Sequence, residues 1–448
     1  MPFIPNTDED RKAMLKTIGV DSFEELISNI PENLRVIGEL NLPKPLSEYE
    51  VVKELKSIAE KNNHTQEFIS FLGGGAYDHY IPAAVDHIIS RPEFFTAYTP
   101  YQPEVSQGTL QTIYEYQTMI CELTGMDASN ASMYDGGSAL AEATLVAISE
   151  TGRNQVLVSK ALHPNYIKII RTYCKGQGFE VTEIDLADGT TNLKDLKEKI
   201  SDKTAAVIIQ HPNFLGILEE MQEFSDITHK FGALFISFND PISLGILTPP
   251  GEYGADIVIG EGQCLGNSLN FGGPYLGIFA VKENLIRRMP GRIAGATVDR
   301  QGRRGFVLTL QTREQHIRRE KATSNICTNQ ALNALAATVY LALLGKQGIK
   351  EVAMQCLQKS HYLAGQISRL DGYRLKYNQP FFKEFVVETP IPPQQIIDAL
   401  LKKRIIAGIN LHDYEFGLDS CLLIAVTEKR NKNEMDLLVE EFKNVVIN

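Results

Sequence analysis

The chain has 448 residues, of which 43% are hydrophobic and 22% charged, the composition of a globular protein with a large core. Its net charge of −11 argues against general binding to nucleic acids or anionic membranes. The sequence opens without a basic segment followed by an apolar run, and its six cysteines form no Cys-x-x-Cys pair. We therefore expect a cytoplasmic protein with reduced thiols and no metal site.

At this length more than one domain is expected. Residues 1–80 have little apolar material of their own, and they predict a helical arm, with helices over 8–18 and 48–61, that packs on another surface such as a second subunit. Residues 81–328 are predicted to form a large α/β domain, and residues 329–448 a small α+β domain.

In the middle of the chain, short aliphatic runs alternate with helical segments. Such runs are typical of strands buried on both faces, and the helices between them predict crossovers and a mainly parallel sheet, whose ligands bind at the carboxyl ends of the strands. The predicted strands cover residues 155–159, 180–184, 205–210, 233–238, 257–260 and 276–281, and the predicted helices cover residues 164–174, 193–200 and 221–231.

Beyond residue 330 the pattern changes to long helices followed by a mixture of strands and helices, which predicts the small domain. The predicted helices cover residues 329–344, 349–370, 393–403 and 433–444, and the predicted strands lie near residues 382–388 and 421–426.

The strand predicted at 257–260 is followed by an unexpected residue. In the common fold of pyridoxal-phosphate (PLP) enzymes, an aldehyde-binding lysine lies just past such a strand, and here the nearest candidate, by its spacing from Asp256, is Cys264. A thiol cannot form the Schiff base that makes PLP an electron sink. The chain therefore does other chemistry or acts on a cofactor held by a partner, and we favour the partner.

Other predicted strand ends also carry polar side chains. His163 and His211 each follow a strand, although a lone histidine is more often structural than catalytic. Asp240 ends a strand where PLP enzymes place an aspartate against the pyridine nitrogen, but an Asp-Pro turn explains it equally well. Lys160 also ends a strand, yet it lies too early in the chain for a Schiff-base lysine.

Two glycine-rich motifs have both structural and functional interpretations. The glycines of FLGGGAYDHY, residues 71–80, allow positive φ and the close approach of another chain or a ligand, or they form a tight turn. Gly136, Gly137 and Ser138 open a helix whose free N–H groups suit a phosphate or carboxylate, although the adjacent Asp135 disfavours a dianion.

A proline-containing segment, residues 97–111, combines a restricted backbone with polar side chains. Pro100 and Pro103 favour an extended path, which suits a rigid surface that positions hydroxyl and amide groups. The alternative is a connector whose tyrosines cover the core. The polar side chains are those of Tyr98, Tyr101, Gln102, Glu104, Ser106 and Gln107.

Residues 287–321 form a basic stretch with nine arginines and one lysine against three acids, a local net charge of +7. Thr323, Ser324 and Asn325 follow and can cap the alanine-rich helix beyond. A helix N-terminus flanked by arginines is a good anion site. A solvated charged face is the alternative.

Several long segments of the chain resemble the P-protein family of the glycine cleavage system, and within it the alpha chains, subunit 1, of glycine dehydrogenase (decarboxylating). The resemblance extends over essentially the full chain. The motifs that carry it are FLGGGAYDHY, FFTAYTPYQPEVSQGTLQTIYEYQTMICELTGMD, YDGGSALAEA, HPNY, QHPNFLG, FGGPYLG and REQHIRREKATSNICT, in this order between residues 71 and 328.

The resemblance implies a PLP-dependent transferase type I fold and an oxidoreductase subunit that is active only with a partner. PLP is then expected in the beta chain, subunit 2, of an α2β2 assembly, with no PLP bound covalently by this chain. In that family glycine loses CO2, and the residual aminomethyl group passes to the lipoyl arm of the H-protein, whose disulfide is reduced. A non-catalytic scaffold or regulatory subunit and a free-standing PLP decarboxylase are the alternatives.

Together with the residue patterns, the resemblance suggests three sets of site residues. We expect the shared catalytic site to be lined from this side by Tyr98, Tyr101, Gln102 and Glu104. We expect the PLP phosphate of the partner chain to be contacted by Thr323, Ser324 and Asn325. We expect a substrate carboxylate or an acidic carrier protein to be bound by Arg292, Arg303, Arg318 and Arg319.

Overall fold

The computed structural model describes residues 5–36, 38, 40–322 and 324–447. The chain divides into two compact units, Met1–Asn63 and His64–Asn448. The strand β1, Ile69–Ser70, pairs in parallel with β15, Ile405–Ile406, so the segment around it belongs to the second unit. The three-part division at residues 80 and 328 stays a prediction.

Within its described residues, the first unit contains three α-helices, α1 (Asp8–Ile18), α2 (Phe23–Leu26) and α3 (Glu48–Ala59). Capping boxes begin the two longer ones, because the side chains of Thr7 and Ser47 accept hydrogen bonds from the backbone three residues on. None of these helices buries a residue. Their apolar faces therefore lack a core within this unit.

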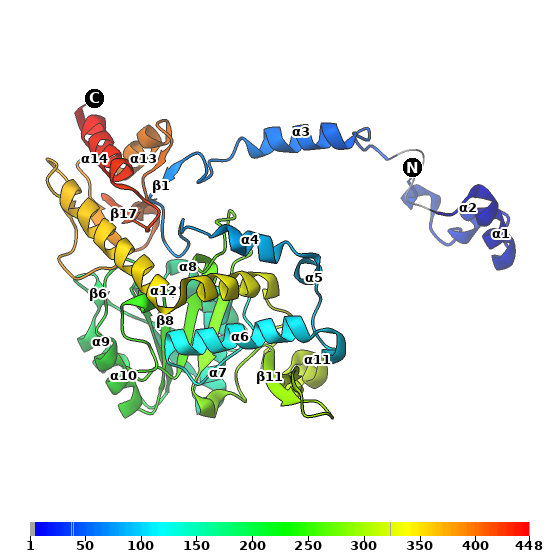
Figure 1. The fold of residues 1–448 in the computed structure, drawn as a ribbon, viewed down its shortest axis with the longest axis horizontal. Helices are drawn as coiled ribbons and strands as arrows, with labels where there is room; N and C mark the ends of the chain where they lie inside the picture. The colour runs from blue at the N-terminus through cyan, green and yellow to red at the C-terminus, as the bar shows by residue number, and fades with distance from the viewer. Residues whose placement is uncertain (1–4, 37, 39, 323, 448) are drawn as a thin grey trace. The chain divides into compact units, whose positions relative to one another are not determined.

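The second unit is built on a seven-stranded sheet (Figure 1). The strand β10 runs antiparallel to both of its neighbours, and the other four pairs are parallel, which confirms the predicted mainly parallel sheet. Every strand predicted for it is present within one residue at each end. In spatial order the strands are β2 (Ala128–Ser129), β10 (Gly277–Val281), β9 (Ile257–Glu261), β8 (Leu234–Asn239), β7 (Thr204–His211), β3 (Gln155–Ser159) and β4 (Glu180–Ile184).

Helices cover both faces of this sheet (Figure 1). Neighbouring strand residues pack on opposite sides, as the two-residue period of a strand requires, so Val207 lies in one core and Ile208 in the other. One face carries α6 (Gln107–Thr124), α9 (Leu193–Lys199), α10 (Met221–Lys230) and the first half of α12 (Ala331–Ile367), and the other carries α7 (Gly136–Thr151) and α8 (Pro164–Lys175).

The long helix α12 links this sheet to a smaller one. Gly345 has φ +58° and ψ −173° within it, so the helix is broken where the sequence predicts two separate helices. Its second half packs on the small antiparallel sheet through Leu363 and Ile367. That sheet contains β13 (Arg374–Leu375), β14 (Glu384–Glu388), β17 (Cys421–Ala425) and β16 (Ile409–Asn410), with α13 (Pro393–Leu401) and α14 (Lys432–Ile447) beside it.

The middle of the basic stretch, residues 293–309, folds as a hairpin, which the sequence pattern does not predict. The strands β11, Ile293–Val298, and β12, Arg304–Thr309, pair antiparallel and pack on α6 through Ala294 and Phe306. Ala294 of β11 and the buried Phe306 and Leu308 of β12 form a small core with Leu110 on that helix.

The remaining elements are short. They are α4 (Ala83–Ile89), α5 (Pro92–Phe95), α11 (Gln315–Arg318), β5 (Leu186–Ala187), β6 (Thr190–Thr191) and 3-10 turns at Glu32–Leu34, Pro103–Val105, Ser243–Gly245, Gly262–Cys264, Glu283–Leu285, Gln311–Arg313, Arg319–Lys321 and Leu411–Asp413. Within the described ranges, no helix is both long and apolar enough to cross a bilayer.

Candidate functional site

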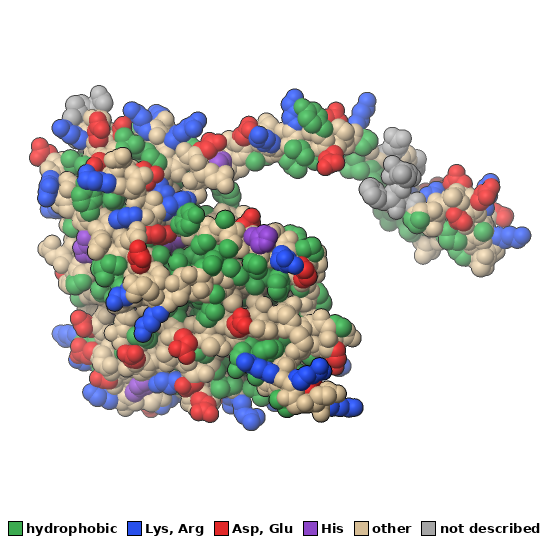
Figure 2. Space-filling model, viewed as in Figure 1, with side chains coloured by type: hydrophobic (Ala, Val, Ile, Leu, Met, Phe, Trp, Pro, Cys, Tyr) green, Lys and Arg blue, Asp and Glu red, His purple; other side chains and the backbone are tan. Residues whose placement is uncertain are grey.

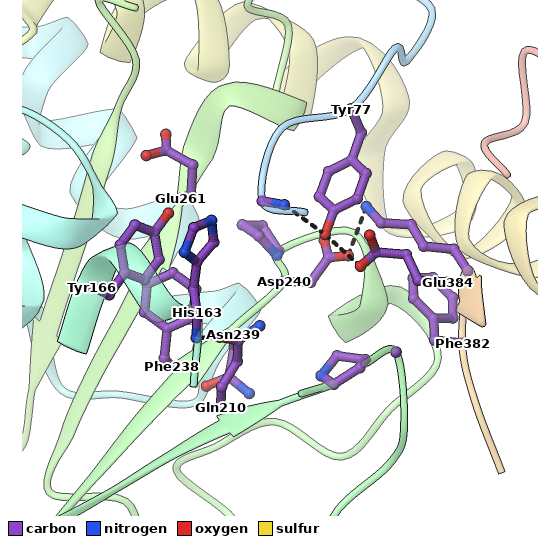
Figure 3. A pocket seen from close by; sticks show the side chains of 15 residues that line it. Tyr77, His163, Tyr166, Gln210, Phe238, Asn239, Asp240, Glu261, Phe382 and Glu384 are labelled. Atoms are coloured by element: carbon purple, nitrogen blue, oxygen red, sulfur yellow. Dashed lines mark hydrogen bonds and ion pairs between the residues drawn. The ribbon is translucent and has the colours of Figure 1, made fainter. Parts of the chain in front are cut away.

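The carboxyl ends of four parallel strands meet at one pocket, which we call the strand-end pocket (Figure 3). Parallel strands present these ends along one edge of the sheet, where ligands of such folds bind. The strands β3, β7, β8 and β9 contribute, in this order, His163, Gln210, the pair Asn239 and Asp240, and Glu261.

Two further segments close the pocket from the side opposite the sheet. Tyr77 comes from the glycine-rich motif, and Glu384 begins β14 of the small sheet. The Tyr77 hydroxyl donates to Glu384 Oε2 at 2.8 Å, and the Gly74 N–H donates to Glu384 Oε1 at 2.7 Å. A Cβ on Gly73 would lie 2.2 Å from Glu384 Oε1. The group that approaches these glycines is a side chain of this chain, and the approach of another chain or a ligand stays a prediction.

The ammonium group of Lys383 occupies the centre of this arrangement. Its Nζ lies 2.6 Å from Asp240 Oδ2 and 3.4 Å from the centroid of the Tyr77 ring, and its side chain is only 2% exposed. The cavity that remains has a volume of about 20 Å³, which is room for about one water molecule. The pocket is thus filled mainly by side chains of this chain.

Burial sets the protonation of the groups that line the pocket. It raises the pKa of Glu384 to about 7, against the hydrogen bonds from Gly74 and Tyr77. It lowers the pKa of His163 to about 4, which keeps the imidazole neutral at pH 7. In that form His163 Nδ1 accepts from the Asn165 N–H at 3.1 Å, and Nε2 donates to Gly74 O at 2.9 Å.

The helix α7 begins at Gly136 as predicted, but two of its first three N–H groups already have partners. Asp135 accepts from the Ser138 N–H at 2.7 Å, and Glu261 accepts from the Gly136 N–H at 2.9 Å. Two carboxyl groups therefore occupy the end of the helix that would otherwise attract a phosphate.

PLP does not fit this pocket. The Cys264 thiol is buried, and it donates to Glu261 O at 3.7 Å, so no amine follows β9. Lys160 lies at the end of β3, but its ammonium group pairs with Asp185 and does not line the pocket. With Lys383 against Asp240 and room for about one water, neither the ring nor the phosphate of the cofactor can be accommodated.

The predicted catalytic residues lie on a separate, exposed surface. Tyr98 is 86% exposed, Gln102 and Glu104 are also exposed, and the 3-10 turn Pro103–Val105 fixes the backbone between them. Beside Tyr98 runs a groove of about 260 Å³. Its walls are residues 94–100, the first turns of α6, and residues 328–335 around the start of α12.

Arg292 connects Tyr101 to the chain that leads into α12. Its guanidinium group donates to Cys327 O at 2.7 Å, to Asn329 Oδ1 at 3.1 Å and to the Tyr101 hydroxyl at 3.4 Å, and it faces Glu314 Oε2 at 3.9 Å. The sequence predicts a role for Arg292 in binding a carboxylate or a carrier. In this structure the side chain is buried, and it holds three segments together.

The prediction that Ser324 and Asn325 cap the alanine-rich helix is wrong, and the predicted contact with a phosphate stays a prediction. The helix α12 begins at Ala331, and Ser132 Oγ accepts from the Gln330 N–H at 3.1 Å. Ser324 Oγ accepts from the Ile326 N–H in a local turn, and Thr323 lies outside the described residues. Ser132, distant in sequence, thus holds the residues that lead into the helix, because its Oγ also accepts from the Asn329 amide at 2.9 Å.

The other three arginines lie apart from Arg292. Arg303 is 77% exposed and pairs with Asp299 at 2.7 Å in the turn of the β11–β12 hairpin. Arg318 and Arg319 are exposed at the end of α11. Figure 2 shows lysine and arginine side chains gathered over β11, β12 and α11. Of the four arginines predicted to bind a ligand or a carrier, one is therefore interior and three are exposed.

The sequence interpretation missed Tyr77, Lys383 and Glu384 as pocket residues. A signal was present in the segment PFFKEFVVE, where Lys383 and Glu384 interrupt an aromatic and aliphatic strand. Charged residues are almost never fully buried without partners, so adjacent charges in a buried strand indicate an internal ion pair.

Comparisons with known proteins agree with one another. The family model for the glycine cleavage system P-protein matches residues 1–442. A probable glycine dehydrogenase (decarboxylating) subunit 1 from Chloroherpeton thalassium is 57% identical over 99% of this chain and 100% of its own length. A relative of the same name from Carboxydothermus hydrogenoformans is 56% identical over 98% of this chain and 99% of its own length. These names imply a second subunit for the relatives.

Solved structures show the same architecture. An inhibitor-bound crystal structure of a glycine decarboxylase (P-protein) of the glycine cleavage system has a TM-score of 0.91 and 43% identity, covering 99% of this chain and 100% of that one. A sphingosine-1-phosphate lyase from Burkholderia pseudomallei has a TM-score of 0.68 at 12% identity, covering 92% and 93% of the two chains.

The sheet, its order and the strand-end pocket place this chain in the PLP-dependent transferase type I class of folds. That fold connects the protein with PLP chemistry. Within this class of folds, the chain belongs to the glycine cleavage system P-protein family.

Proposed function

We propose that this chain is the first subunit of a glycine dehydrogenase (decarboxylating) and that it acts with a second subunit that carries PLP. The observation that carries the proposal is the 57% identity to a subunit 1 relative over the whole of both chains. A free-standing PLP decarboxylase needs an amine beside the cofactor. The strand-end pocket of this chain offers no space for that cofactor.

The division of work between the two chains follows from the chemistry. Bound to the second subunit, PLP supplies the electron sink that decarboxylation of glycine requires. This chain supplies polar side chains from the exposed surface around residues 97–105. Tyr98, Gln102 and Glu104 reach outward from a backbone stiffened by prolines, which suits the orientation of glycine or of the lipoyl sulfurs.

Arg292 acts as a positioning residue in this proposal. It contacts Tyr101 and the segment that contains Cys327 and Asn329, so it fixes one wall of the groove beside Tyr98. Ser324 and Asn325, with Thr323, lie in the segment that precedes this wall, and we assign them to the PLP phosphate of the second subunit. The exposed Arg303, Arg318 and Arg319 are assigned to the acidic carrier, the lipoylated H-protein.

The N-terminal unit supports an assembly of the α2β2 type. Its helices bury no residue, and their apolar side chains, such as Leu55 of α3 at 60% exposure, face solvent. Covering apolar surface is favourable by about 25 cal/mol per Å², so a second subunit that covers these helices stabilises them. We place the assembly in the cytoplasm, where the six free thiols stay reduced.

Reconstitution tests the proposal. The chain, the second subunit and their mixture are each supplied with glycine, PLP and lipoylated H-protein, and exchange of labelled bicarbonate into glycine is measured. We expect exchange in the mixture only. Exchange by this chain alone would contradict the assignment of PLP to the second subunit, and full exchange by the second subunit alone would show that this chain is a scaffold.

A further inference from the structure

Lys383 joins three parts of the second unit at one buried point. Its Nζ contacts Asp240 at the end of β8 at 2.6 Å and His79 Nε2 in the glycine-rich segment at 3.2 Å, while its own backbone leads into β14 of the small sheet. The ammonium group also lies over the Tyr77 ring. These contacts offer it a carboxylate, an imidazole acceptor and an aromatic face, which are the partners that an alkylammonium ion prefers.

The groups behind His79 complete this environment. Because Lys383 donates to Nε2, His79 Nδ1 carries the proton and donates to Glu428 Oε2 at 2.6 Å. Glu428 Oε1 accepts from the Tyr80 N–H at 2.7 Å. The network is therefore satisfied from Asp240 through to Glu428, and each hydrogen-bonded member orients the next.

A metal ion is the other cation that such groups could hold. His79, Cys356 and Glu428 place ligand atoms within 4.8 Å of one another. The Lys383 ammonium group lies 3.2 Å from the imidazole of that set, so a divalent ion there would face a like charge at short range. The positive charge of the site is already supplied by the lysine.

We propose that the strand-end pocket of this chain is a site for a primary alkylammonium ion and that the chain fills this site permanently with Lys383. Asp240 stands where enzymes of this fold place an aspartate against a cofactor nitrogen, and here the positive charge opposite it belongs to the protein. The internal ligand fixes the small sheet on the large one and closes the pocket to aldehydes. This inference goes beyond the proposed function.

Truncation of the internal ligand and its chemical replacement test the proposal. In the full chain, Lys383→Ala removes three methylenes and the amine, which corresponds to the propylammonium ion. We expect Lys383→Ala to lower Tm and propylammonium chloride to restore part of the loss with saturation, because a ligand that binds only the folded chain stabilises it by mass action. The wild-type chain is expected to show no such response.

Two controls test whether the effect of propylammonium on Tm arises from binding in the pocket. Tetramethylammonium chloride at the same ionic strength carries the charge without hydrogen-bond donors, and it is expected to leave the Tm of Lys383→Ala unchanged. The double variant Lys383→Ala/Asp240→Ala lacks the anion and is expected to lose the response to propylammonium. Equal responses of the wild type and Lys383→Ala, or none by a folded Lys383→Ala chain, would overturn the proposal.

A measurement on the wild-type chain applies even if Lys383→Ala does not fold. The native chain is treated with PLP and borohydride, and modified lysines are mapped by mass spectrometry. Lys160 is the matched control, because it is also ion-paired but is 42% exposed. We expect modification of Lys160 in the native chain and of Lys383 only after unfolding. A phosphopyridoxyl group on Lys383 of the native chain would show an open, aldehyde-reactive site and would refute the proposal.

Discussion

The strand-end pocket and the exposed surface around residues 97–105 are both rich in polar side chains, but they differ in where those groups find partners. In the pocket, Asp240, Lys383 and Glu384 are bonded to one another or to their neighbours. On the surface, the side chains of Tyr98, Gln102 and Glu104 have no partner within the part of the chain that the structure describes.

This difference distinguishes polar groups that hold the fold together from polar groups that are available to bind another molecule. Groups in a buried network stabilise the fold, and they are unavailable to a ligand unless the network opens. Exposed groups on a stiff backbone cost little to present and gain partners when another molecule docks. We therefore expect changes in the pocket to alter the free energy of unfolding, and changes on the surface to alter turnover of the assembled enzyme.

The largest effect is expected for Asp240→Ala, which leaves the Lys383 ammonium group buried without its counter-charge. Removing one partner of a buried ion pair lowers the free energy of unfolding by about 3 to 5 kcal/mol, whereas replacing both partners by apolar groups often leaves it nearly unchanged. Denaturant unfolding gives the free energy of unfolding of Asp240→Ala and of Asp240→Ala/Lys383→Met, and we expect the double variant to be the more stable of the two. A double variant as unstable as the single one would show that the pair is not coupled.

The second largest effect is expected on the stability of the folded chain when the pH is lowered. The folded chain binds the His163 proton with a pKa of about 4 and the unfolded chain with a pKa near 6.5, so stability falls as the pH drops through this interval. The loss from pH 6.5 to pH 4.5 is roughly 2 to 3 kcal/mol. Unfolding of wild type and His163→Asn at both pH values checks it, since the variant should lack this loss.

His87 provides the matched control for the acid experiment, because it is exposed and lies away from the pocket. We expect His87→Asn to keep the pH dependence of the wild type. A parallel loss of stability in wild type and His163→Asn would mean that other groups dominate the acid response.

On the exposed surface, Tyr101→Phe and Glu104→Gln are expected to lower glycine turnover of the reconstituted enzyme at least tenfold, about 1.4 kcal/mol. The free energy of unfolding should change by about 1 kcal/mol or less, because Tyr101 loses one long hydrogen bond and Glu104 loses none. Tyr80→Phe, an exposed tyrosine outside this surface, is the control. Wild-type turnover in both variants would remove residues 97–105 from the site.

The smallest effect is expected for Arg303→Ala. Its ion pair with Asp299 is exposed, and such pairs contribute between 0 and about 1 kcal/mol. If Arg303 attracts the acidic carrier, the KM for H-protein should rise at low ionic strength and the difference should shrink in salt. Arg91→Ala, which breaks a similar exposed pair with Glu93, serves as the control. Equal KM values in the two variants would exclude Arg303 from docking.

Much of the fold could be predicted from the sequence because its signals are local. Six of the seven strands of the large sheet are short aliphatic runs that the sequence predicts within one residue at each end, whereas the two-residue β2 is too short to be predicted. The break at Gly345 follows from a glycine that adopts positive φ inside a helical pattern. The hairpin of β11 and β12 is not predicted from the charge of residues 287–321, because only one of the nine arginines in that stretch, Arg304, lies within its two strands.

The sequence by itself determined the sheet, the family motifs and the missing amine after β9, because each depends on residues close together along the chain. Only the tertiary structure decided that Lys383 meets Asp240, that Ser132 contacts the residue before α12 and that Arg292 is an interior residue. These contacts join distant segments, and their partners are chosen by how the sheets and helices pack. The local sequence around each of these residues therefore does not predict its distant partner.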